Sequence, residues 1–229
     1  MSEPANKALF SYPPQAAFGR PLPKNKLYEK SGANTRLKDL FVSQVDQIIW
    51  QYKLAPETIN LPARPGVPEV QVFSIHLKTP ELHHDVLRCI DGAVQFPIVF
   101  ELNHEGRTQM VACHKRPSDA DARQWVCSDY FASPWQPATA PRQALPVVLD
   151  MAALYENLLR TLIPLPPRPQ EKLADLVLRL GKLNALQRDI QKTQTQLAKE
   201  KQFNRKVGIN AQLRELKTDL EKLRDRDDL

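Results

Sequence analysis

The chain of 229 residues contains only seven glycines and three cysteines, and it has no apolar run long enough to cross a membrane. Few glycines leave few places where the backbone could cradle a phosphate, and neither the P-loop nor the dinucleotide-binding pattern is present. Three widely spaced cysteines are typical of reduced thiols, and the N-terminus lacks the charged and apolar regions of a secretory signal. We therefore expect a cytoplasmic protein that carries no cofactor.

Patterns of catalytic residues are scarce as well. No paired cysteine or histidine spacing typical of zinc occurs, so we expect no metal site. A nuclease of the restriction-enzyme type needs an acid and then Glu/Asp-x-Lys on an adjoining strand, because carboxylates hold Mg²⁺ and lysine steadies the attacking water. The best fit in this chain combines Lys78, Asp91 and Glu101, although His76 stands where the motif needs an acid. A Mg²⁺-dependent nuclease is therefore an alternative to a non-catalytic role.

Prolines divide the first two thirds of the chain. Residues 1–34 are interrupted by prolines and are predicted to form an irregular segment that packs on the body. Residues 35–164 combine helical spacing with strand-like alternation, and their order predicts an α+β domain with a mostly antiparallel sheet and flanking helices. The predicted elements are a helix over 35–52, a strand over 70–78, a helix over 79–90, strands over 96–102, 107–114 and 124–131, and a helix over 147–162.

The residue spacing changes after the proline-rich segment 163–169. Residues 170–227 contain no proline, and leucines recur at three- and four-residue intervals, which predicts a C-terminal α-helical coiled-coil arm that docks a partner. The second leucine run is out of phase with the first by two residues, so the chain either turns or changes its packing partner near 203–210. The predicted partner-binding residues are Leu173, Leu176, Leu180, Leu183, Ile190, Leu197, Leu213, Leu216, Leu220 and Leu223.

Positive charge is concentrated in this arm. From residue 168 onward there are 15 Lys and Arg against 10 Asp and Glu, which gives a net charge of +5. This is nearly all of the net charge of +6 of the whole chain. The densest cluster spans eight residues, and on one continuous helix it would form a band about two turns long. Clustered cations bind nucleic-acid phosphates because binding releases counterions, so this cluster predicts a nucleic-acid contact. The alternative interpretation is a solvated helix face that only keeps the arm soluble. The predicted nucleic-acid contacts are Lys199, Lys201, Arg205 and Lys206.

Five segments carry a resemblance to a known family. They are LPKNKLY at 22–28, FVSQVDQIIWQYKL at 41–54, PETIN at 56–60, Ile90-Asp91 followed by FPIVFEL at 96–102, and KQFNRKV at 201–207. Together they resemble the bacterial domain-of-unknown-function family 4391 over nearly the whole chain. The resemblance implies genes beside helicases and DNA methyltransferases in restriction or anti-phage clusters.

The resemblance and the arm together define the expected function. We expect a non-catalytic accessory or adaptor subunit of a bacterial DNA-directed anti-phage or restriction-modification-like complex. Its arm would dock a helicase or DNA methyltransferase subunit and contact DNA, with no membrane involved. The alternatives are the nuclease described above and a stand-alone coiled-coil protein that forms homo-oligomers.

Overall fold

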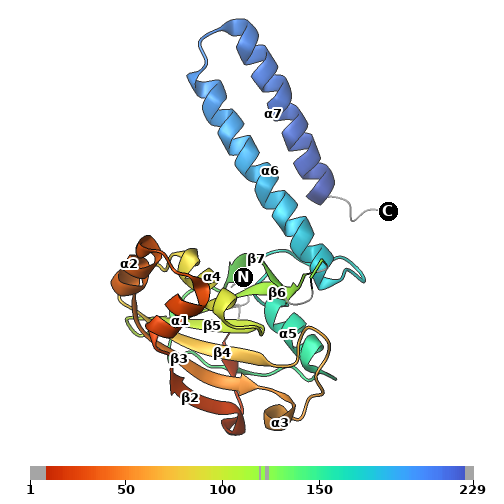
Figure 1. Ribbon diagram of the computed structural model, residues 1–229. Coiled ribbons are helices and arrows are strands. Elements are labelled where there is room, and N and C mark those ends of the chain that lie inside the picture. The colour runs from red at the N-terminus through yellow and green to blue at the C-terminus, as the bar shows by residue number, and fades with distance from the viewer. Residues whose placement is uncertain (1–8, 119, 122–123, 225–229) are drawn as a thin grey trace. The chain divides into compact units, whose positions relative to one another are not determined.

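The computed structural model describes residues 9–118, 120–121 and 124–224 (Figure 1). The chain divides into two compact units, Met1–Pro164 and Leu165–Leu229. The first unit contains a sheet with helices, and the second contains two long helices. The first eight residues of the predicted N-terminal segment and residues 225–227 of the predicted arm lie outside the described residues.

Seventeen elements follow one another along the described residues. The strands are β1 (Phe10–Ser11), β2 (Ala17–Pro21), β3 (Val45–Leu54), β4 (Val70–Leu77), β5 (Ile98–His104), β6 (Arg107–Pro117), β7 (Trp125–Ala132), β8 (Gln136–Pro137) and β9 (Gln143–Ala144). The helices are the 3-10 turn η1 (Pro14–Ala16), α1 (Lys24–Ser31), α2 (Thr35–Gln44), α3 (Pro56–Ile59), α4 (His84–Ala93), α5 (Met151–Arg160), α6 (Leu173–Lys199) and α7 (Phe203–Arg224).

The main sheet of the first unit has the order β2-β3-β4-β5-β6-β7, with β8 paired to β6. All of its strand pairs are antiparallel except β4 and β5, which run parallel. A parallel pair needs a crossover connection, and α4 supplies it between these two strands. The sheet is thus mostly antiparallel, as predicted. β7 is an edge strand of this order.

The helix predicted over 35–52 is wrong in its second half. α2 begins after Asn34, whose side chain accepts a hydrogen bond from the Leu37 amide at 2.9 Å, but it ends at Gln44. The chain continues as β3, which pairs with β2 on one side and β4 on the other. This segment is rich in β-branched and aromatic residues, which suit a pleated surface. Because apolar residues at three- and four-residue spacing occur in both halves, the stripe alone did not locate the change.

Smaller differences from the predicted elements affect both ends of the first unit. The segment predicted to be irregular contains β1, β2 and α1, and α1 ends at Gly32, whose φ of 63° favours glycine. The helix predicted from 147 begins only at Met151, because Asp150 accepts a hydrogen bond from the Ala153 amide and caps it. The helix predicted from 79 begins at His84.

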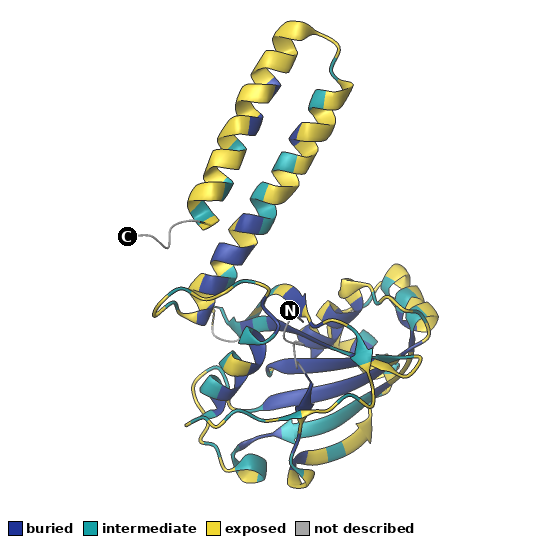
Figure 2. Ribbon diagram, turned by 180° about the vertical axis from the view of Figure 1, so that it is seen from behind, coloured by how far each residue is buried: buried dark blue, intermediate teal, exposed yellow. Residues whose placement is uncertain are grey.

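Both faces of the central strands are buried (Figure 2). Phe73 and Phe100 belong to one core cluster with Val86 and Ile90 of α4. Successive side chains of a strand point to opposite faces, so the buried Val72 and its neighbours on adjacent strands face away from α4. β4 is buried at seven of its eight positions, and these include the polar residues Gln71 and Ser74.

The second unit is a helical hairpin. α6 and α7 lie side by side and run in opposite directions (Figures 1 and 2), joined by a turn over 200–202. The turn explains the phase difference between the two leucine runs, because each run belongs to its own helix. Gly208 lies inside α7 and ends no helix. In the described part of the chain, no helix has both the length and the apolar character that a membrane span requires.

Candidate functional site

The three residues of the nuclease alternative do not converge on one point. Lys78 donates from Nζ to the Val42 carbonyl at 2.9 Å, at the end of α2. Glu101 follows Phe100 on β5, so its side chain points to the sheet face opposite α4, which carries Asp91. A sheet therefore separates the two carboxylates, and they cannot share one metal ion.

Glu101 has a counterion of its own. Arg142 makes two parallel contacts with its carboxylate, at 2.7 Å (Nη1 to Oε1) and 2.9 Å (Nη2 to Oε2), and the Glu101 side chain is only 7% exposed. The same guanidinium donates to the Phe10 carbonyl at 2.8 Å. A bidentate pair of this kind is among the stronger ionic contacts in proteins. Glu101 thus holds the β1 and β9 segments against the central strand β5.

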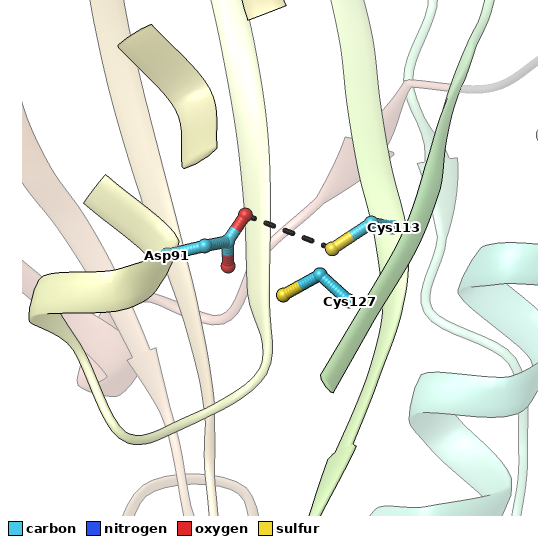
Figure 3. Close-up of side chains that lie close together, drawn as sticks. All are labelled: Asp91, Cys113 and Cys127. Carbon is cyan, nitrogen blue, oxygen red and sulfur yellow. Dashed lines mark hydrogen bonds between the residues drawn. The ribbon is translucent and has the colours of Figure 1, made fainter. Parts of the chain in front are cut away.

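Asp91 lies in a different polar cluster, between α4 and the strands β6 and β7 (Figure 3). Lys115 of β6 is fully buried, and its Nζ donates to the Asp91 carboxylate at 3.2 Å and to the carbonyls of Asp91 and Val94 at 2.6 Å each. The other carboxylate oxygen accepts the Tyr130 hydroxyl at 2.5 Å. All three protons of the ammonium are therefore used, as a buried charge requires.

Burial shifts the pKa values of the acidic groups in this cluster. Burial raises the pKa of the Asp91 carboxyl, and Lys115 and the hydrogen bond from Tyr130 oppose that rise. Burial and the Asp91 charge raise the pKa of the Tyr130 hydroxyl, so it stays protonated and donates to Asp91. The cluster closes around the C-terminal end of α4, whose last carbonyls the ammonium satisfies.

Two thiols complete the cluster. Cys113 Sγ lies 3.6 Å from the Asp91 carboxylate, and Cys127 Sγ lies within 4.8 Å of both groups (Figure 3). These three side chains are the group of His, Cys, Asp and Glu residues in the described structure whose ligand atoms come close enough for a metal ion. Both Asp91 oxygens already bind Lys115 and Tyr130, so a cation would have to displace a buried ammonium.

A cavity of about 480 Å³ opens beside these groups. Trp125 and Cys127 of β7 line it on one side, and Arg88 of α4 lines it on the other. Asp91 reaches it from the cluster, and Gln95 lies after the end of α4. The cavity thus leads from the surface to one of the two thiols.

The predicted nucleic-acid contacts lie at the tip of the hairpin. Lys199 ends α6, Lys201 lies in the turn, and Arg205 and Lys206 stand in the first turn of α7. These residues do not lie on one continuous helix, because the chain turns over 200–202, but the turn still brings them together. Lys199, Lys201 and Arg205 line an open hollow of about 790 Å³, together with Lys192.

The leucines predicted to bind a partner lie within the hairpin and are covered in the chain itself. Leu173, Leu176, Leu180, Leu183 and Leu213 are buried. Ile190, Leu197, Leu216, Leu220 and Leu223 are half-buried. A partner could use these side chains fully only if α7 separated from α6. The large apolar side chains that are exposed on the hairpin are instead Leu178, Phe203 and Val207.

Several residues of these clusters have no signal in the sequence. Lys115 stands in a strand, where every second residue of a half-buried sheet faces water, so a lysine there gives no sign of burial. Arg142 lies in a loop 41 residues from Glu101 in the chain. Cys113 and Cys127 follow no known spacing, and only the pairing of β6 with β7 brings them together.

Comparisons with known proteins give one match. The model of the family described as domain of unknown function (DUF4391) matches residues 10–220. No curated protein and no solved structure matches the chain.

Proposed function

The chain belongs to the DUF4391 family, whose model covers residues 10–220, and we propose that it is a non-catalytic adaptor whose hairpin tip binds nucleic acid. As the family resemblance implies, the complex would be a bacterial DNA-directed defence assembly of the anti-phage or restriction-modification type. The partner would be its helicase or DNA methyltransferase subunit. The observation that carries the proposal is the gathering of Lys199, Lys201, Arg205 and Lys206 at one exposed tip.

The charges at the tip are free to meet phosphates. All four side chains are exposed, and no carboxylate lies within salt-bridge distance of them in the described part of the chain. The nearby acid Glu200 is engaged, because its Oε1 accepts the amides of Lys201 at 2.8 Å and Gln202 at 2.9 Å. These hydrogen bonds lower the pKa of Glu200, which stays ionised and occupies the N-terminal end of α7. Phosphate binding at the tip therefore falls to the four cations.

The same geometry supports an adaptor over a nuclease. Lys78, Asp91 and Glu101 are each bound to a separate partner inside the first unit. Because the leucines of the hairpin pack between α6 and α7, its outer surface consists mainly of polar and basic residues. Such a hairpin suits a spacer that carries charge to a polyanion while the rest of the chain meets a protein partner.

The nucleic-acid half of the proposal is tested by fluorescence anisotropy with labelled single- and double-stranded DNA at several salt concentrations. Four phosphate contacts predict a slope of log K against log salt of about −3.6 for double-stranded DNA, at about 0.9 per phosphate, and of about −2.8 for single strands, at about 0.7. The triple variant K201E/R205E/K206E should lose most of the binding. The matched control K182E/R214E/K217E makes the same charge change on exposed residues along the hairpin. The control should bind far more tightly than the tip variant. Equal loss in both variants, or no binding by the wild type, would contradict direct contact.

The adaptor half is tested by co-expression with the helicase and DNA methyltransferase subunits that the family resemblance leads us to expect beside the gene. Both the wild type and K201E/R205E/K206E should co-purify with one of these subunits, because the tip is proposed to bind DNA rather than protein. Co-purification that depends on the tip would assign the basic cluster to a protein partner instead. A stable homo-oligomer that ignores both neighbours and DNA would support the stand-alone alternative.

A further inference from the structure

Two thiols from neighbouring strands lie together in the first unit. Cys113 of β6 pairs with Tyr130 in the register of β7, and Lys115 pairs with Cys127, with a shift in register between the two pairs. This places Cys113 and Cys127 diagonally across the strand pair, and Figure 3 shows both sulfur atoms on the side of Asp91. Their sulfur atoms lie within 4.8 Å of one another.

The two thiols differ in their access to solvent. Cys113 is 1% exposed, whereas Cys127 is half-buried and lines the 480 Å³ cavity beside Arg88 and Trp125. A small molecule that enters this cavity therefore meets Cys127 first. The remaining cysteine, Cys89, lies elsewhere and shares a hydrogen bond of 3.0 Å with the Ser31 hydroxyl.

The charges around the pair favour a thiolate at Cys127. The hydrogen bond from Cys113, together with the positive charges of Lys115 and Arg88, lowers the pKa of Cys127 against the effects of burial and Asp91. The pKa of Cys113 is raised by that same hydrogen bond, by burial and by Asp91. Cys113 has one S–H, so it donates either to Asp91 or to Cys127 at any moment.

We propose that Cys127 is a reactive thiol for small hydroperoxides and that Cys113 resolves its oxidised form as an intramolecular disulfide. The oxidant enters through the cavity that Arg88, Trp125 and Cys127 line. The buried sulfur of Cys113 then attacks the oxidised Cys127 and closes the disulfide. Reversible disulfides of this kind in reducing compartments are mostly redox-sensing. The inference is independent of the nucleic-acid role of the hairpin.

The chemistry has two balanced steps. In the first, the Cys127 thiolate attacks one oxygen of hydrogen peroxide, an S–O bond forms, the O–O bond breaks, and the leaving hydroxide takes a proton to become water. In the second, Cys113 loses its proton, its sulfur attacks the sulfenic sulfur of Cys127, and hydroxide leaves and is protonated to water. Two thiols are thus oxidised to one disulfide while one peroxide is reduced to two waters. Asp91, 3.6 Å from Cys113 Sγ, is placed to accept the proton of Cys113 in the second step.

Bond formation requires the two sulfur atoms to approach to about 2.05 Å. The surroundings allow a movement of this kind, because β7 is an edge strand and carries Cys127 near its start. The irregular register between Cys113 and Lys115 interrupts the ladder at this point. The Tyr155 hydroxyl bridges the interruption, donating to the Cys113 carbonyl and accepting from the Lys115 amide.

The test uses the full chain, reduced, freed of reductant and treated with hydrogen peroxide before alkylation with a maleimide. Intact mass should show two fewer alkylated thiols and the loss of two hydrogens, and peptide mapping should identify a Cys113–Cys127 link that reductant removes. In C113S, dimedone should trap a sulfenic acid on Cys127. C127S should form no link and should keep a free Cys113.

The matched control C89S removes the third thiol and should form the link at the wild-type rate. C127A provides a second variant at the reactive position if C127S folds poorly, as judged by circular dichroism. The proposal is overturned if Cys89 oxidises as fast as Cys127. It is also overturned if Cys127 proceeds to sulfinic acid without a disulfide, or if both thiols survive peroxide unchanged.

Discussion

Replacing Lys115 with methionine tests how the first unit holds a buried charge. Methionine keeps most of the volume of the lysine stem but removes three hydrogen bonds, to the Asp91 carboxylate and to the carbonyls of Asp91 and Val94. Each buried acceptor left without a donor costs about 1–3 kcal/mol, and breaking a buried ion pair from one side costs about 3–5 kcal/mol. We therefore expect K115M to lower the free energy of unfolding by about 4 kcal/mol, a large share of the stability of an ordinary domain.

The loss should depend on pH in a defined direction. Burial already raises the pKa of Asp91, and K115M removes the positive charge that opposes this rise. A carboxyl whose pKa is raised on folding keeps its proton in the folded state, while the unfolded chain releases it above about pH 4. Stability of the variant should therefore fall as the pH rises, by up to about 1.4 kcal/mol per pH unit until the folded pKa is passed. The deficit relative to the wild type should be larger at neutral than at acidic pH.

The assay is equilibrium urea unfolding of K115M, D91N and the double variant, followed by tryptophan fluorescence and circular dichroism. Because the two side chains form one pair, the double variant should be less destabilised than the sum of the single variants by about 2 kcal/mol. K30M, which removes an exposed lysine of α1, is the control and should stay within about 0.5 kcal/mol of the wild type. Additive losses, or a K115M deficit that does not grow with pH, would refute the interpretation of Asp91 and Lys115 as a buried, coupled pair.

Two further predictions concern the other ion pairs. R142Q should lower the free energy of unfolding by about 2 kcal/mol, because Glu101 stays buried but loses its bidentate partner. Urea unfolding measures this difference, and a change below about 0.5 kcal/mol would contradict the prediction. In the second unit, the hydrogen bond from Arg179 lowers the pKa of Glu171, so this contact contributes stability above the unfolded pKa of about 4.3 and loses it as the pH falls through the folded pKa. E171Q should therefore speed amide exchange near Arg179 at pH 7, and the difference from the wild type should disappear as the pH falls through the folded pKa of Glu171. A difference that does not shrink as the pH falls would exclude the ionic contribution.

Some features of the fold follow from local sequence. The strands β4, β5, β6 and β7 were predicted because alternation and β-branched residues report a pleated, buried surface over a few residues. The helical character of the segment that holds α6 and α7 was predicted because leucines at three- and four-residue spacing report one covered helix face. One long helix and a hairpin both remained open. The phase difference between the two leucine runs required either a turn or a change of packing partner near 203–210, and the structure has a turn over 200–202.

The sequence by itself thus determined the mostly antiparallel sheet, the helical character of the C-terminal segment and the concentration of positive charge in it. Only the tertiary structure decided that Val45–Leu54 is a strand, since its apolar stripe satisfies a helix and only pairing with β2 and β4 favours extension. Only the tertiary structure joined Asp91 to Lys115 and Cys113 to Cys127. These contacts depend on the register of β6 with β7 and on the packing of α4 above them, and such long-range geometry leaves no periodic trace in the chain.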